Sequence, residues 1–487
     1  MSTNNTKQAA WVAVGSLCHY SIALVSSMIL SRYFNKADYG TYKQVMYVYH
    51  TLLTVFTLGL PRAFSYFLPR VPDGQARRLI GKLTKLFFLL GLSFTIVLFF
   101  FSPLIAQLLH NPELNNALKL FAIVPTILLP TLGVDGIMAT YKKTQILAIY
   151  KTSTSLLTLL CVALPVMFFD MGYMDAIKGF IFGSIIQCVL ALILKNYPVK
   201  SFAKERCDIS LKEVFHFSVP LLMASLWGLL INSTDQFFIS RFFGNEVFAE
   251  FSNGSIELPF VPMIVGACTI VLSPVFSKMS HEKVDFKTKV FPLWKSVFEK
   301  TAMLIYPILV YCIVFATPIM EVLYGKQYAN SGIYFFLKMI VNFFNLIAFA
   351  PLLINTGKVK FYSNVHAGTA IALILFEYIS ILVFNSPYIV AIVSLICQLG
   401  KTFVMLSVIA AMFDVKLFDL FPWKLLLSII IPSFGVLYVL RFSFAILLHF
   451  HGLLLIVMTL FLYAVLYVFY CCVMKIDYLS LVKSLRK

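Results

Sequence analysis

Charged residues are scarce in this chain. Asp, Glu, Lys and Arg make up 12% of its 487 residues, whereas hydrophobic residues make up 60%. A soluble protein of this size could not bury so much apolar surface. No polar stretch is long enough to fold as a separate soluble domain. The composition therefore excludes an ordinary soluble protein and predicts an integral membrane protein.

The sequence also lacks the residue patterns of most enzymes and metalloproteins. It has no Cys-x-x-Cys, no His-Glu-x-x-His and no two adjacent acidic residues. Gly400-Lys401-Thr402 is similar to the end of a phosphate-binding loop, but Leu395 stands where that loop requires its first glycine. We therefore expect no catalytic residues, no cofactor and no metal site. The net charge of +18 indicates loops facing anionic lipid rather than a nucleic-acid partner.

About fourteen apolar stretches are long enough to cross a bilayer, which takes roughly 20 residues each. Continuous apolar runs without period-two alternation favour helices over a barrel. Most of the 39 Lys and Arg fall in every second turn, and the positive-inside rule makes those turns cytoplasmic. We expect a multi-pass protein of the bacterial inner membrane with both termini in the cytoplasm. The run 9–31 is too long for a signal-peptide core and is expected to be the first span.

The chain contains an internal repeat. Ser31-Arg32-Tyr33-Phe34 recurs 209 residues later as Ser240-Arg241-Phe242-Phe243, and Ser102-Pro103 recurs 215 residues later as Thr317-Pro318. Both pairs follow odd-numbered spans, so the repeats run in parallel and predict two pseudo-symmetric six-helix lobes. The expected divisions are an N-terminal lobe (1–195), a cytoplasmic connector (196–213), a C-terminal lobe (214–412) and a last segment with two further spans and a cytoplasmic tail from residue 475 (413–487).

Polar residues recur at helical spacing on several predicted spans, most clearly on spans 1, 2, 7 and 8. Such residues are costly in a membrane and usually face a cavity or a partner. We expect these stripes to line a cavity shared by the two lobes. The candidates for binding an anionic substrate are Arg32, Lys43, Arg62 and Arg241. The candidates for polar lining or ion coupling are His19, His50, Asn232, Asp235, Glu257 and Lys401.

Structural roles explain some of these residues equally well. Arg32 and Arg241 lie at span ends, where long basic side chains often extend to the interface. Glu377 and Lys401 lie in neighbouring spans and are expected to form an ion pair if their role is structural.

Several segments resemble one known family. Residues 29–42, which include Ser31-Arg32-Tyr33-Phe34, resemble the first outer loop of bacterial polysaccharide-biosynthesis flippases. These are the Wzx-type O-antigen and capsule transporters of the multidrug/oligosaccharidyl-lipid/polysaccharide superfamily. Gly59-Leu60-Pro61-Arg62, Asn232-Ser233-Thr234-Asp235 and Leu323-Tyr324-Gly325 are similar to later segments of that family. No such motif surrounds Glu257, so its role depends on the stripe alone.

The resemblance implies a flippase that carries an undecaprenyl-pyrophosphate-linked oligosaccharide from the inner to the outer leaflet by alternating access, for lipopolysaccharide O-antigen or capsule. It also implies contact with membrane lipids and cooperation with a polysaccharide polymerase and a chain-length regulator. Two alternatives remain open. A cation-coupled multidrug antiporter of the same superfamily would use acidic groups such as Asp235, Glu250 and Glu257. A membrane polysaccharide polymerase or ligase would need a large outer loop, and the longest that we expect here has about 15 residues.

Overall fold

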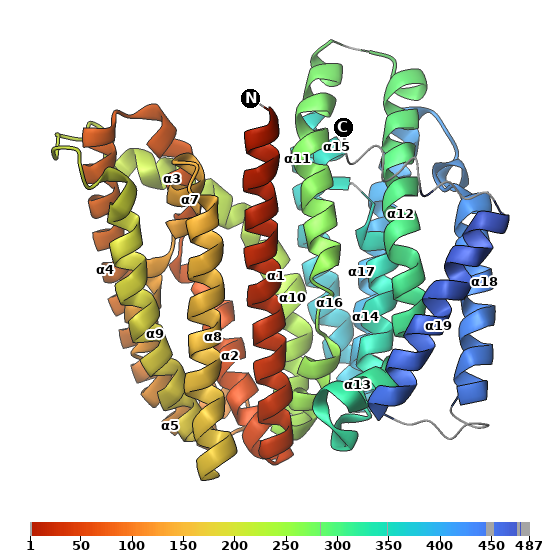
Figure 1. Cartoon of the computed structure of the whole chain (residues 1–487), viewed down its shortest axis with the longest axis horizontal. Helices are drawn as coiled ribbons and strands as arrows, with labels where there is room; N and C mark the ends of the chain where they lie inside the picture. Colours follow the sequence, from red (N-terminus) through yellow and green to blue (C-terminus); the bar gives the residue numbers. More distant parts are fainter. Residues whose placement is uncertain (1, 283, 348, 445–451, 475–477, 479–487) are drawn as a thin grey trace. The chain divides into compact units, whose positions relative to one another are not determined.

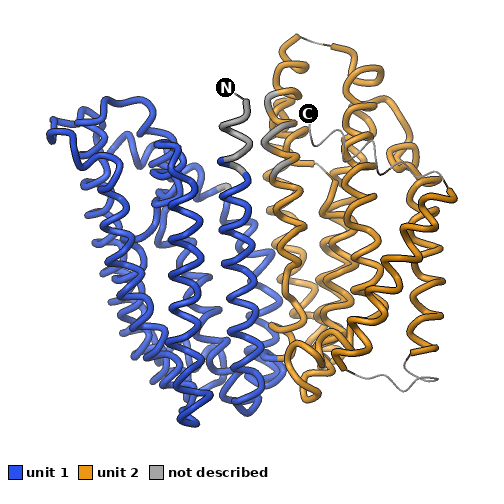
Figure 2. The backbone as a smooth tube through the Cα atoms, viewed as in Figure 1, with its two compact units in different colours: residues 1–249 blue, residues 250–487 orange. Residues whose placement is uncertain are grey.

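The computed structural model of the chain describes residues 2–282, 284–347, 349–444, 452–474 and 478. Within these ranges the chain forms helices and no β-strand, which confirms the predicted all-helical membrane fold. The chain divides into two compact units, residues 1–249 and 250–487 (Figure 2). The expected cytoplasmic tail, 475–487, lies outside the described residues apart from Tyr478.

Unit 1 contains ten helices or parts of helices among its described residues (Figure 1). They are α1 (Ser2–Tyr33), α2 (Lys36–Phe56), α3 (Pro61–Phe67), α4 (Asp73–Leu108), α5 (Glu113–Phe121), α6 (Val124–Leu128), α7 (Val134–Thr140), α8 (Thr144–Phe169), α9 (Tyr173–Asn196) and most of α10 (Leu211–Gly254). Helix α1 packs along α8, which packs in turn against α9. Helix α2 contacts α4 where the rings of Phe56 and Phe94 stack, with centroids 4.4 Å apart.

Unit 2 is built from the end of α10 and the helices that follow it. They are α11 (Phe260–His281), α12 (Phe291–Val314), α13 (Ala316–Tyr324), α14 (Ser331–Asn345), α15 (Phe349–Asn355), α16 (Val359–Phe384), α17 (Pro387–Phe413), α18 (Trp423–Phe442) and α19 (Gly452–Val473). A buried cluster joins α12 to the last two helices, with Tyr311 and Val314 packed near Leu437 and Tyr463. The two C-terminal helices are therefore an integral part of unit 2.

Eleven helices in the described part are long and apolar enough to span a membrane, or thirteen if two bent pairs count as one span each. The expected count of fourteen is not confirmed. The range of α10 covers the place where two separate spans were expected to meet. The backbone of Gly244 (φ 82°, ψ 178°) is non-helical there, so this range comprises two helices that meet at a kink.

The internal repeat extends to the ends of the helices. Helices α8 and α16 have 26 residues each and begin 215 residues apart. Both end in a residue with left-handed backbone, Asp170 (φ 50°) and Asn385 (φ 44°), and these are also 215 residues apart. A left-handed residue is a common way to terminate a helix. The unit boundary lies inside α10, downstream of the segment 196–213, and the expected lobe boundaries stay a prediction.

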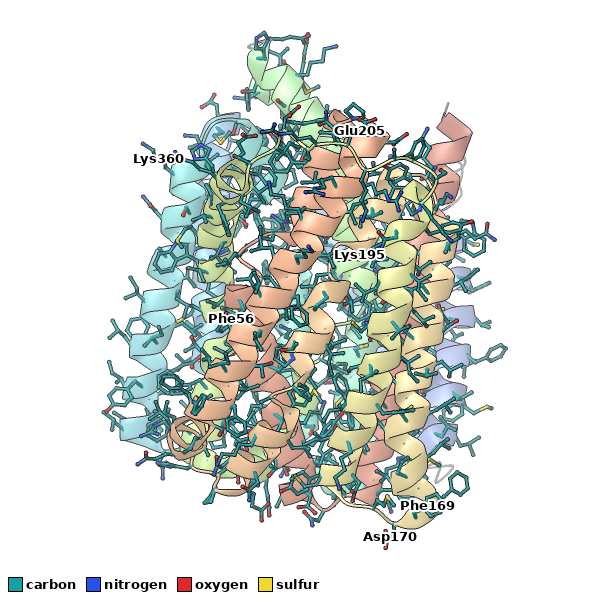
Figure 3. All side chains as sticks on the ribbon, turned by 90° about the vertical axis from the view of Figure 1, so that its left-hand side faces the viewer. Phe56, Phe169, Asp170, Lys195, Glu205 and Lys360 are labelled. Carbon is teal, nitrogen blue, oxygen red and sulfur yellow. The ribbon has the colours of Figure 1, made fainter. Side chains whose placement is uncertain are left out.

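The segment after α9 lies along the N-terminal half of α4. The amide of Glu205 donates to the carbonyl of Gly74 at 3.3 Å, and the ammonium of Lys82 donates to the carbonyl of Ile209 at 2.8 Å. Figure 3 shows Glu205 at one end of unit 1 and Asp170 at the other. The connector is therefore fixed on α4, at the end of unit 1 opposite the α8–α9 turn.

A tyrosine joins the α7–α8 turn to the start of α4. The hydroxyl of Tyr141 donates to the carboxylate of Asp73 at 3.1 Å. Burial and the contact with Asp73 raise the pKa of Tyr141 to about 12. The hydroxyl therefore stays protonated at neutral pH and keeps this contact.

Candidate functional site

Helix α2 carries the polar stripe predicted for span 2. Lys43 donates to the hydroxyl of Ser27 on α1 at 3.3 Å and lies 5.3 Å from the ring of Tyr39. Tyr47 donates to the carbonyl of Ser233 on α10 at 3.1 Å. His50 is exposed one turn further along. The stripe therefore contacts α1 through Lys43 and α10 through Tyr47.

The other candidates on α10 lie near this stripe. Asp235 is half-buried, and its carboxylate lies within electrostatic range of the Tyr47 hydroxyl. Asn232 is exposed, and its carbonyl accepts a bond from Gln236 at 3.4 Å. The structure thus brings Asp235 close to the α2 stripe.

The three candidate arginines have different surroundings. Arg241 donates to the carbonyl of Leu108 at 2.6 Å, where α4 ends. A cation at a helix C-terminus satisfies a free carbonyl and interacts favourably with the helix dipole. Arg32 is exposed in the last turn of α1, and Arg62 is exposed in the first turn of α3. Their role in substrate binding stays a prediction, and Arg241 has a structural role as well.

A buried network of amides and hydroxyls lies beside Arg241, and the sequence analysis missed it. The side-chain amide of Asn111 donates to Thr41 at 2.9 Å and to Gln44 at 2.6 Å, and Gln44 donates to Ser240 at 2.8 Å. Asn245 donates to the same Thr41 hydroxyl at 3.2 Å. The network connects α2, the α4–α5 turn and α10 inside unit 1.

Unit 2 repeats this contact. Asn330, just before α14, donates to the carboxylate of Glu250 at 3.4 Å, as Asn111, two residues before α5, donates to Thr41. Glu250 follows Thr41 by the repeat distance of 209 residues. The same distance separates Gln44 from Asn253, and both are fully buried. An asparagine beside a helix start therefore holds the second span of each repeat.

A second polar group in unit 1 joins α1, α7 and α8. The Nδ1 atom of His19 lies 2.6 Å from the hydroxyl of Ser155, one turn of α8 away from Lys151. Lys151 forms an ion pair with Asp135 on α7 at 2.9 Å. The predicted stripe of span 1 therefore contacts polar residues of α8, whereas the sequence analysis did not single out Asp135.

Lys195 is buried, although it is the last residue before the predicted cytoplasmic connector (196–213). Its exposed fraction is 1%, because α9 continues to Asn196 and keeps the side chain inside unit 1 (Figure 3). The ammonium lies 3.4 Å from the hydroxyl of Thr84 and 4.9 Å from the ring of Phe64. It forms no ion pair with a described residue. This cation is held by a hydroxyl and by aromatic faces.

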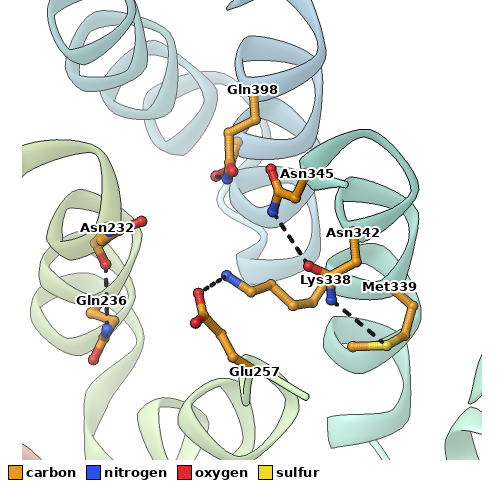
Figure 4. Close-up of polar contacts among 9 residues, drawn as sticks. Asn232, Gln236, Glu257, Lys338, Met339, Asn342, Asn345 and Gln398 are labelled. Atoms are coloured by element: carbon orange, nitrogen blue, oxygen red, sulfur yellow. Dashed lines mark hydrogen bonds and ion pairs between the residues drawn. The ribbon is translucent and has the colours of Figure 1, made fainter. Parts of the chain in front are cut away.

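In unit 2, Glu257 is partly exposed and forms an ion pair with a lysine. Its carboxylate lies 3.6 Å from the ammonium of Lys338 on α14 (Figure 4). Glu257 stands in the non-helical segment between α10 and α11. On α14, Asn345 donates to the carbonyl oxygen of the Asn342 side chain at 3.3 Å. In Figure 4 the side chain of Gln398, from α17, points toward Asn345.

Lys401 belongs to the same group of residues. It lies on α17, one turn after Gln398, within electrostatic range of Lys338 and of His366 on α16. The expected ion pair between Lys401 and Glu377 is wrong. Glu377 follows His366 by eleven residues on α16, which places it about 16 Å further along the helix axis. In the described part of the chain, no three His, Cys, Asp or Glu side chains form a group that could hold a metal ion.

Comparisons with known proteins agree with this architecture. A model of a family described as polysaccharide biosynthesis protein matches residues 29–332. The structure is similar to the lipid II flippase MurJ in an inward closed conformation, with a TM-score of 0.72 and 16% identity over 96% of this chain and 99% of that one. It is also similar to an inward-facing multidrug resistance transporter of the MATE family (TM-score 0.62, 12% identity, 82% of this chain and 99% of that one). A MOP-superfamily transporter from Pyrococcus furiosus gives a TM-score of 0.58 at 11% identity, over 84% of this chain and 96% of that one. No curated protein matches the chain in sequence. At these identities the solved structures establish a shared fold.

Proposed function

The chain belongs to the polysaccharide biosynthesis protein family, and on this premise we propose that it is a flippase for a lipid-linked oligosaccharide. It moves an undecaprenyl-pyrophosphate-linked repeat unit from the inner to the outer leaflet by alternating access. The product supplies a surface polysaccharide such as O-antigen or capsule. The family match over residues 29–332 is the observation that carries this proposal.

The polar groups of the helices support an anionic, sugar-bearing substrate. A sugar–diphosphate headgroup cannot cross hydrocarbon unaided, because charged and hydroxyl groups lose their hydration there. Unit 1 offers Lys43 and His50 on α2, and unit 2 offers Lys338 and Lys401. Tyr47 and the amides of unit 2 are the type of group that binds sugar hydroxyls. Binding of the headgroup by Arg32, Arg62 and Arg241 remains part of the proposal.

The antiporter alternative shares the fold but fits the charges less well. A binding site for organic cations needs a surplus of negative charge. Two of the acids within the spans each face a lysine instead, Asp135 facing Lys151 and Glu257 facing Lys338, and Glu250 accepts from Asn330. A polymerase or ligase is a weaker alternative, since both family and fold indicate a transporter without enzymatic activity.

Net export needs an energy source that biases the conformations of the transporter. We propose that a proton or Na⁺ binds at Asp235, His50 or Glu257. The cluster of His19, Lys151 and Asp135 is a further place for such coupling, because it joins titratable groups of three helices. Flux measured with and without an ion gradient tests this step.

A deletion strain tests the function itself. Cells without the gene should accumulate undecaprenyl-linked single repeat units in the inner leaflet, and the restored gene should clear them. A strain without its polysaccharide polymerase is the control, because its single units should reach the outer face unpolymerised. Single units displayed outside in the deletion strain would refute the flippase and favour the polymerase.

A further inference from the structure

We propose that Lys338 on α14 and Lys401 on α17 bind the diphosphate of the substrate, and that Glu257 occupies Lys338 while the substrate is absent. This inference rests on the proposed function, because it names the part of the lipid-linked substrate that unit 2 holds. Glu257 would then act as an internal substitute for a phosphate oxygen.

The group formed by Lys338, Lys401 and Glu257 has more basic than acidic side chains, which favours the binding of an anion. Lys338 and Lys401 lie close enough for their charges to repel each other, and His366 lies within electrostatic range of Lys401. Lys401 forms no ion pair within the described residues, and Lys338 has Glu257 alone as an acidic partner. Two ammonium groups against one carboxylate leave a surplus of positive charge in an apolar helical unit. Such a surplus is costly unless a further anion binds there.

The contact between Glu257 and Lys338 is loose enough to be exchanged. The nitrogen–oxygen distance is 3.6 Å, and the Glu257 side chain is 60% exposed whereas that of Lys338 is 20% exposed. A tight ammonium–carboxylate hydrogen bond is about 2.7–2.9 Å long, as in the Lys151–Asp135 pair at 2.9 Å. Lys338 is thus held inside the unit, and Glu257 can leave it without losing a short hydrogen bond.

The backbone around this group is interrupted in two places. Glu257 lies in the non-helical segment between Gly254 and Phe260. Asn345 is the last residue of α14, where the chain bends by 41° into α15. Discontinuous helices with free backbone groups are typical of substrate and ion sites in transporters. The breaks give the carboxylate of Glu257 freedom to move while Lys338 stays on a continuous helix.

Amide side chains accompany each lysine on its helix. Lys338, Asn342 and Asn345 share one face of α14, and Gln398 lies one turn from Lys401 on α17, which packs against α14. In Figure 4 the amide of Asn345 donates to Asn342, which lies one turn of α14 beyond Lys338. Lysine binds phosphate as a point charge, so two lysines suit the two phosphates of a diphosphate. The amides are placed to bind the phosphate oxygens or the first sugar.

Binding of short prenyl anions to the purified full-length chain tests the proposal. The probes are farnesyl diphosphate, farnesyl phosphate and farnesol, with affinity measured by thermophoresis in detergent. We expect the diphosphate to bind tightest and farnesol weakest. Lys338→Gln and Lys401→Gln should each weaken diphosphate binding about tenfold or more, while Lys338→Arg and Lys401→Arg should retain most of it. Lys178→Gln is the matched control, because Lys178 is an exposed lysine paired with Asp175.

The Glu257→Gln variant tests the exchange specifically. Removal of the competing carboxylate should tighten diphosphate binding several-fold, and the double variant with Lys338→Gln should bind no better than Lys338→Gln alone. Unchanged or weaker binding by Glu257→Gln would overturn the exchange. Wild-type affinity in both lysine→glutamine variants would overturn the site, even if the gene still restores export in the deletion strain. If instead the binding results hold but the gene does not restore export, the site stands and the proposed function fails.

Discussion

Asn111 holds three parts of unit 1 together, and its replacement by alanine should destabilise the protein strongly. The side chain is 5% exposed. It donates to Thr41 at 2.9 Å and to Gln44 at 2.6 Å, and its carbonyl oxygen accepts from the amide of Glu113 at 3.2 Å. Each such bond contributes about 1 kcal/mol net, and a buried acceptor left without a donor costs about 1–3 kcal/mol. The three bonds together contribute about 3 kcal/mol and the Gln44 oxygen left without its donor adds about 1–3 kcal/mol, so we expect a total loss of roughly 4–6 kcal/mol.

Thermal unfolding of the purified protein in detergent measures this loss. Asn111→Ala should lower the unfolding midpoint clearly. Asn196→Ala is the matched control, because Asn196 is exposed and its amide donates to the carbonyl of Leu192 within its own helix, at 2.9 Å. A substitution of that kind usually changes stability by less than about 0.5 kcal/mol. Asn330→Ala should give an intermediate result, since its contact with Glu250 is longer, at 3.4 Å.

Equal midpoints for the Asn111 and Asn196 variants would refute the reasoning. They would mean that water or a shift of α2 replaces the lost bonds, and that the network does not fix α10 against α2. An Asn330 variant less stable than the Asn111 variant would contradict the ranking taken from the distances.

Four further predictions concern topology, transport and buried charge. Reporter fusions after Lys204 and after Lys326 should report opposite sides of the membrane, and the same side for both would contradict the expected topology. Arg62→Ala and Arg241→Ala should reduce export in the complementation assay at normal membrane levels, with Arg→Lys restoring it partly at best; full export by both alanine variants would leave only structural roles. We expect that an ion gradient no longer changes the flux in proteoliposomes for at least one of three variants, Asp235→Asn, Glu257→Gln and His50→Gln. If the flux of all three variants still responds to the gradient as in the wild type, coupling at these residues is ruled out. Lys195→Met should leave the thermal midpoint unchanged or raised, because a buried cation without an acidic partner costs desolvation; a clear fall in the midpoint would show that the contacts of Lys195 with Thr84 and Phe64 stabilise the unit.

The helices and the repeat could be predicted from the sequence because both depend on local patterns. Apolar runs of about 20 residues mark spans, and two short motifs at offsets of 209 and 215 residues marked the repeat. The structure extends the repeat to Asp170 and Asn385, which end their helices with the same backbone conformation. Such a feature cannot be read from hydropathy, because two different residues provide it.

The contacts between stripes could not be predicted, because they depend on which helices are neighbours. Helical spacing identified Lys43 on α2 and His19 on α1, but not their partners Ser27 and Ser155. Gln44 was missed because it lies one position from the stripe, about 100° around the helix and on the buried side. Asn111 was missed because it lies in a turn. Polar residues are common in exposed turns, and only the structure shows that this turn is buried.

Pairing also changes what the acidic residues imply about the substrate. Counted along the sequence, Glu250 and Glu257 gave some support to an acidic cavity for a cation. In the structure Asp135 and Glu257 each face a lysine, whereas Lys43, Lys195 and Lys401 form no ion pair within the described residues. Each unit therefore contains at least one lysine within its helices that forms no ion pair with a described residue, and the cost of keeping such a charge there without a counter-ion favours an anionic substrate at these lysines. This asymmetry, which no count of acidic and basic residues contains, supports a phosphate-bearing lipid as the molecule that the transporter carries.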